Sequence, residues 1–174
     1  MYVDILAQQD VATTISIFIT LSFTVAFFLA YRGWRDNSSV FIISAVLFVD
    51  FVLANNALYD ILVATEITDP ENFYLRWVQY DALAIIAIIV CHLIFRVKLQ
   101  KITMFTMYLL MANAVMYLAM HLDIIIYGNR EPWWLWTLYT PFVHLVELII
   151  ATSLIAVPIR HKREQYKEAQ QLVK

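Results

Sequence analysis

The chain has 174 residues, of which 62% are hydrophobic and 15% are charged, and its formal net charge is −2. Soluble domains are about 45–50% apolar and about 25% charged, so the composition excludes an ordinary soluble domain and predicts an integral membrane protein. One cysteine excludes an internal disulfide framework. No phosphate-binding loop, nucleophile elbow or cysteine–histidine metal motif occurs, so we expect a function other than catalysis.

Five apolar stretches lie along the chain, each near the about 20 residues that a helix needs to cross a bilayer. They run over about 11–31, 39–64, 73–95, 102–127 and 134–159. The links between them are short, which favours neighbouring antiparallel helices. The sequence therefore predicts an all-α, five-transmembrane-helix, up-down bundle over residues 1–159, followed by a basic cytoplasmic tail over 160–174.

Basic residues alternate between the two ends of this bundle and predict its orientation, because lysine and arginine concentrate in cytoplasmic loops. The links after the first and third stretches and the tail carry Arg32, Arg35, Arg96, Lys98, Lys101, Arg160, Lys162, Arg163, Lys167 and Lys174. The opposite end carries only Arg76 and Arg130. We expect a multi-pass protein of a bacterial inner membrane, with the N-terminus outside and the C-terminus in the cytoplasm. Aromatic residues near the outer ends, Tyr74, Trp77, Tyr80 and Tyr139 among them, are interpreted as interfacial anchors.

The stretch over 39–64 carries Asp50 near its middle. A carboxylate at the bilayer centre costs about 2.5–3.5 kcal/mol on insertion scales, so it must face protein, a partner group or water. A rise of about 1.5 Å per residue places Asn113, His144 and Glu147 at a similar depth. We predict that Asp50 and Glu147 bind a proton or cation and that Asn113 and His144 orient them, since two carboxylates about 4 Å apart would share a proton.

The same conversion of residue number to depth places a second polar set in the outer third of the bundle. Its members are predicted to form an outer vestibule: Asn56, Asp60, Arg76, Asp81, His121 and Asp123. Together the two sets predict a polar funnel that opens outward. Aliphatic residues such as Ile88, Leu110 and Ile150 are expected to close it below.

Three functions are compatible with this pattern. The first is a membrane protein that binds or conducts a proton, cation or small polar ligand. It is expected to need no cofactor and to form a homo-oligomer, or to join a membrane-complex partner, in the lipid bilayer. The second is a non-catalytic accessory or structural subunit of a larger membrane complex, in which the polar residues hold helices together. The third is a membrane haem or metal redox protein. In it His144 and Glu147, spaced i and i+3, would bind a metal with Asp50, His121 or Asp123, or His121 and His144 would bind a haem. A nucleic-acid partner is not expected.

Overall fold

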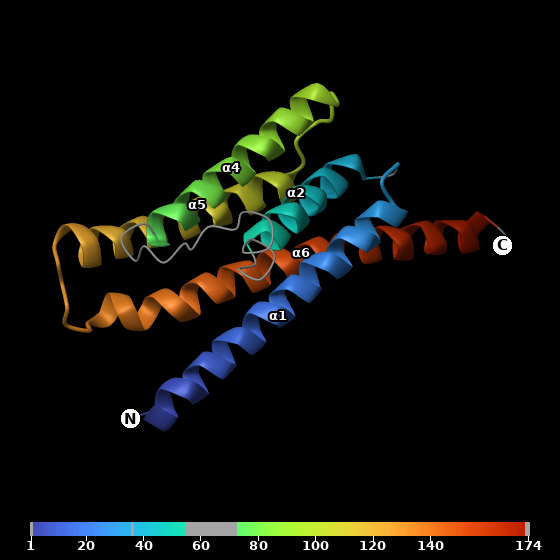
Figure 1. The fold of residues 1–174 in the computed structure, drawn as a ribbon. Helices are drawn as coiled ribbons and strands as arrows, with labels where there is room; N and C mark the ends of the chain where they lie inside the picture. The colour runs from blue at the N-terminus through green and yellow to red at the C-terminus, as the bar shows by residue number, and fades with distance from the viewer. Residues whose placement is uncertain (1, 36, 55–72, 173–174) are drawn as a thin grey trace.

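The computed structural model describes residues 2–35, 37–54 and 73–172, and these residues form helices with no strand among them (Figure 1). The α-helices are α1 (Tyr2–Arg32), α2 (Ser38–Ala54), α4 (Phe73–Ile94), α5 (Lys101–His121) and α6 (Trp134–Leu172). A short π-helix, η2 (Leu122–Ile126), continues α5. The all-helical class and the five predicted helices are thus confirmed.

Three of these helices are long and apolar enough to cross a membrane, namely Phe73–Ile94, Lys101–Ile126 and Trp134–Lys167. The described apolar parts of the first two helices are shorter, Ile17–Arg32 and Ser38–Phe51. Large apolar side chains such as Leu83, Leu93 and Val115 are exposed on the outer faces of the long helices. A surface of this kind matches lipid better than water.

The helices form a closed bundle in which α2 is the central member. Each helix contacts its neighbour along the chain, and α6 packs back against α1. In addition, α2 contacts α5 and α6, so it is in contact with all four other helices. The α1–α2 and α4–α5 connections lie at the same end of the bundle, the end from which α6 extends toward the C-terminus (Figure 1).

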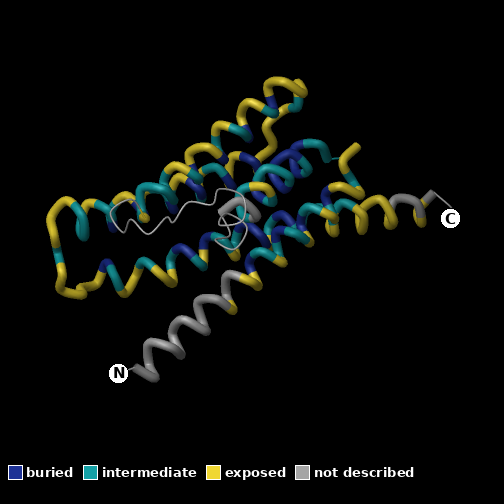
Figure 2. The backbone as a smooth tube through the Cα atoms, in the orientation of Figure 1, coloured by how far each residue is buried: buried dark blue, intermediate teal, exposed yellow. Residues whose placement is uncertain are grey.

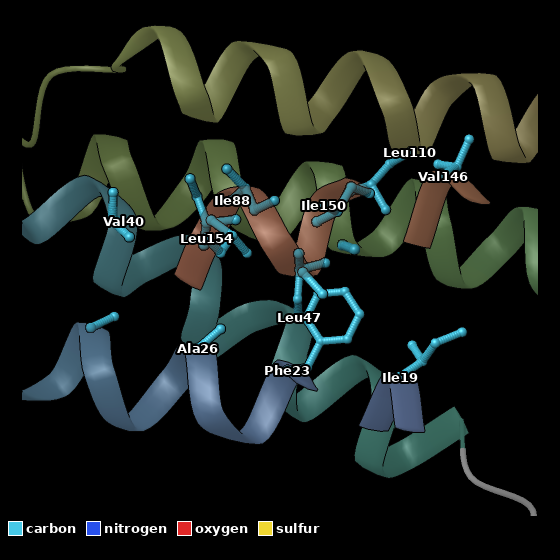
Figure 3. Close-up of a cluster of buried hydrophobic side chains, with 14 residues drawn as sticks. Ile19, Phe23, Ala26, Val40, Leu47, Ile88, Leu110, Val146, Ile150 and Leu154 are labelled. Atoms are coloured by element: carbon cyan, nitrogen blue, oxygen red, sulfur yellow. The ribbon is translucent and has the colours of Figure 1, made fainter. Parts of the chain in front are cut away.

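One apolar core is shared by all five helices. Residues such as Phe23 on α1, Leu47 on α2, Ile88 on α4, Leu110 on α5 and Ile150 on α6 are almost fully buried and converge in the bundle interior (Figure 3). Burial is concentrated in the middle of the bundle, whereas the last turns of α6 are exposed (Figure 2). The predicted tail over 160–174 therefore continues α6 as far as Leu172, and most of its side chains whose burial is described are exposed.

The spacing of residues along α5 explains which of its faces is buried. The buried positions follow one another at intervals of three or four residues, which is the spacing of one helix face: Thr103, Thr106, Leu110, Asn113, Tyr117 and Met120. Four of these six side chains carry a polar group, namely Thr103, Thr106, Asn113 and Tyr117. The α5 helix therefore brings polar groups into the bundle interior along its whole length.

Candidate functional site

A small cavity of about 20 Å³ lies between α2, α4, α5 and α6. This volume is enough for about one water molecule. Its walls are formed by Asp50, Phe51, Trp77, Tyr80, Asp81, Leu110, Asn113, Tyr117, Glu147 and Ile150. Three carboxyl groups from three helices, and a carboxamide from a fourth, therefore meet around one water-sized space.

The position of Asp50 follows from the packing of its neighbour Phe51. The ring of Phe51 stacks on Phe23 of α1, with the ring centroids 4.2 Å apart. Successive residues of a helix project about 100° apart, so the contact with α1 turns Asp50 away from α1. Asp50 consequently faces the cavity that α4, α5 and α6 also line.

Asp81 and Asn113 are deeply buried polar side chains of the cavity. They are 8% and 2% exposed, respectively. Asp81 Oδ2 and Asn113 Oδ1 have no hydrogen-bond partner within the part of the chain that the structure describes. An unpaired buried polar group costs about 1–3 kcal/mol, so each of these atoms requires an explanation beyond helix packing.

The charge of the lining residues determines what the cavity can bind. The lining has three acidic residues, Asp50, Asp81 and Glu147, and no lysine, arginine or histidine. Three carboxylates around so small a space repel one another unless a proton or a cation neutralises part of their charge. The arrangement is therefore chemically suited to hold protons, or a small cation, on oxygen atoms.

Aromatic rings form the part of the wall that the sequence analysis did not recognise. Trp77 stacks on Tyr117 with centroids 5.8 Å apart, and Tyr117 meets Tyr139 edge to face at 5.7 Å. Trp77 also contacts Tyr80 at 5.8 Å. The interpretation of Trp77 and Tyr80 as interfacial anchors is incomplete, because both line the cavity.

A spacing signal for these aromatic residues was present in the sequence. Trp77 precedes Asp81 by four residues, and Tyr117 follows Asn113 by four residues. Side chains four apart share a helix face. Once Asp81 and Asn113 face the cavity, their aromatic neighbours do so as well.

His144 is next to the cavity but does not line it. Its Nδ1 lies 3.4 Å from Glu147 Oε2, one turn along α6, and both side chains are partly exposed. Of the four predicted binding residues, Asp50, Asn113 and Glu147 thus meet in the cavity. His144 reaches that group only through Glu147.

Some of the residues predicted to form the outer vestibule line the cavity in the structure, and others do not. Asp81 belongs to the cavity itself, together with Asp50. Arg76, His121 and Asp123 are not among the lining residues, and His121 lies at the last position of α5. The positions of Asn56 and Asp60 lie outside the described residues.

Asp123 stabilises the connection between α5 and α6 through hydrogen bonds. Its carboxylate accepts hydrogen bonds from the indole nitrogens of Trp136 at 2.7 Å and Trp133 at 2.9 Å, and from Asn129 Nδ2 at 3.1 Å. The π-helix η2 carries Asp123 in its first turn. These contacts explain Asp123 as a structural residue of the loop.

Within the described ranges, no group of three or more His, Cys, Asp or Glu side chains is placed to hold a metal ion. The candidate site lies within an all-α bundle that has three helices able to span a membrane. No protein-family model, curated protein or solved structure matches the chain.

Proposed function

We propose that this protein is an integral membrane protein that binds protons at the acidic cavity and passes them across the bilayer. One observation carries the proposal: Asp50, Asp81 and Glu147 line a single water-sized cavity between helices. Intramembrane carboxyl groups are costly to bury and mark proton and ion pathways in membrane proteins. Asp50, Asp81 and Glu147 are then the proton acceptors, and Asn113 orients the proton or water between them.

The size of the cavity favours a proton over a larger ligand. A volume of about 20 Å³ holds about one water molecule, and a proton can move between carboxyl groups through one water. A metal cation needs six or more oxygen ligands in the case of Ca²⁺ and near-octahedral geometry in the case of Mg²⁺. The described residues contain no group placed for such coordination.

The proposed orientation in the membrane has the N-terminus outside and the C-terminus in the cytoplasm. It is supported by the basic residues of the α1–α2 and α4–α5 connections and of the end of α6, which share one end of the bundle (Figure 1). Lysine and arginine near the ends of membrane helices remain on the cytoplasmic side. The end with Lys98 and Lys101 is then the inner end.

The test is proton flux into proteoliposomes that contain a pH-sensitive dye and the purified protein. Asp50→Asn and Glu147→Gln are expected to abolish the flux, because each replaces a proton acceptor by a neutral amide of similar shape. Glu131→Gln is the matched control, since Glu131 is an exposed residue of the α5–α6 connection. Its flux should equal that of the wild type.

Two results would contradict the proposal. Wild-type flux in both the Asp50→Asn and the Glu147→Gln variants would show that the cavity carries no protons. A wild-type protein that is inactive alone and is purified with a stoichiometric membrane partner would instead support the role of an accessory subunit. Melting temperatures of all variants should be measured to separate loss of flux from loss of folding.

A further inference from the structure

The buried polar residues of the described part of the chain lie on three of the helices. None of the seven is on α1 or α6, and all are on α2, α4 and α5: Ser39, Ser44, Asp81, His92, Thr103, Thr106 and Asn113. Asp81 and Asn113 belong to the cavity already described. The other five extend from the cavity toward the inner end of the bundle.

At the inner end, three of these residues form a hydrogen-bonded chain. Ser39 Oγ lies 2.8 Å from His92 Nε2 and 2.6 Å from Thr103 Oγ1, while His92 Nδ1 lies 2.7 Å from the carbonyl oxygen of Ile88. All three side chains are at most 3% exposed. This hydrogen-bonded chain connects α2, α4 and α5. Apolar packing of the helices alone would not require these hydrogen bonds.

The direction of the hydrogen bonds in this chain can be derived. A carbonyl oxygen only accepts, so His92 Nδ1 carries the proton that is donated to Ile88. In the neutral ring Nε2 is then the acceptor, Ser39 donates to it, and Thr103 donates to Ser39. When Nε2 takes up a proton it becomes a donor, and the Ser39 and Thr103 bonds reverse. The chain can therefore receive and release a proton without moving a helix.

Ser39 lies directly beneath the surface, although its own side chain is fully buried. It lines a groove of about 530 Å³ whose other walls are Ser38 and residues 97–101. The groove lies at the end of the bundle with the α4–α5 connection. The chain of His92, Ser39 and Thr103 thus lies just below the surface at the proposed cytoplasmic side.

Thr106 lies between Thr103 and Asn113 on the buried face of α5. Its Oγ1 is buried and has no hydrogen-bond partner among the described residues. Serine and threonine hydroxyls inside helices can bond to their own backbone, as Thr24 and Thr152 do in this protein. The Thr106 hydroxyl remains available instead to a passing proton or water.

We infer that Thr106 and the chain of Thr103, Ser39 and His92 form the inner half of the proton pathway, leading from the acidic cavity to the groove at residues 97–101. This inference rests on the proposed function. Leu47, Ile88 and Leu110 lie between the cavity residues and the inner polar residues of their helices and are at most 3% exposed. They separate the two polar regions in this structure, so a proton crosses from one to the other when the packing of these side chains opens.

Thr106 gives the sharpest test, because its hydroxyl group can be removed without a large change in shape. Thr106→Val replaces the hydroxyl by a methyl group, whereas Thr106→Ser retains the hydroxyl. We expect Thr106→Val to lower proton flux in proteoliposomes about tenfold, the effect of losing about one hydrogen bond at the rate-limiting point. Thr106→Ser should retain most of the flux, and Thr152→Val, on the exposed face of α6, should retain all of it.

The results separate the inner pathway from the proposed function. Wild-type flux in Thr106→Val, or equal losses in Thr106→Val and Thr106→Ser, would overturn the inner pathway even if Asp50→Asn abolishes flux. Full flux in Asp50→Asn would overturn the proposed function itself. Ser39→Ala is an independent variant: it breaks the bonds to both His92 and Thr103, and unchanged flux in it would also contradict the inner pathway.

Discussion

The substitution Asp81→Asn is expected to make the protein more stable and less active. Asp81 is 8% exposed, one of its oxygen atoms has no partner among the described residues, and it lines the same cavity as Asp50 and Glu147. As an acid it either adds a third negative charge to the cavity or takes up a proton, and both cost free energy. Asparagine removes this cost and supplies two N–H donors to the neighbouring carboxyl oxygens.

The size of the effect follows from these contacts. Leaving a buried polar group unpaired costs about 1–3 kcal/mol, and the asparagine recovers part of that cost. We expect the free energy of unfolding to rise by about 1–2 kcal/mol. For a chain of this length, each kcal/mol corresponds to about 2–4 °C, so the melting temperature should rise by about 2–8 °C.

The assay combines thermal unfolding in mild detergent with proton flux in proteoliposomes, on the same preparation. Glu131→Gln serves as the control, because it removes an exposed carboxylate from a loop. A higher melting temperature with reduced flux would identify Asp81 as a residue kept for function at the expense of stability. A melting temperature equal to or below that of the wild type would refute the reasoning that the three carboxyl groups crowd one another.

Two further variants test the fold around the site. Asp123→Ala should lower the melting temperature and change the fluorescence of Trp133 and Trp136, because both indoles lose their acceptor; an unchanged emission spectrum would contradict this role. Leu47→Ala should lower the free energy of unfolding by about 2–5 kcal/mol, as expected for a fully buried leucine. Val49→Ala, at an exposed position two residues away, should change it much less, and equal losses would contradict the assignment of Leu47 to the core.

The helices could be predicted from the sequence because hydrophobicity and length determine them. The stretch expected over 73–95 is the helix Phe73–Ile94, and the one over 102–127 is Lys101–Ile126. Depth along a helix also follows from residue number, since the rise per residue is fixed. For this reason Asp50, Asn113 and Glu147 could be grouped before their helices were placed, and the three do line one cavity.

Which side chains meet across helices could not be predicted, because it depends on helix stagger and rotation. Asp81 lies in the third turn of α4 and Glu147 in the fourth turn of α6, so counting residues from the helix ends places Asp81 nearer the surface. The helices are staggered, and the two side chains line the same cavity. The rotation of α2 is likewise fixed by the contact of Phe51 with Phe23, which no periodicity in either segment indicates.

Magnitudes argue against the simplest alternative, in which the buried polar residues only hold the helices together. Interhelical hydrogen bonds in membrane proteins contribute about 0.6 kcal/mol on average, whereas an unpaired buried polar atom costs about 1–3 kcal/mol. At the interface of α2, α4 and α5, three buried atoms lack a partner among the described residues: Asp81 Oδ2, Thr106 Oγ1 and Asn113 Oδ1. The polar side chains of this interface therefore stabilise the packing of the helices less than aliphatic side chains would. Aliphatic residues at these positions would stabilise the bundle, and the polar residues in their place are consistent with a path for protons.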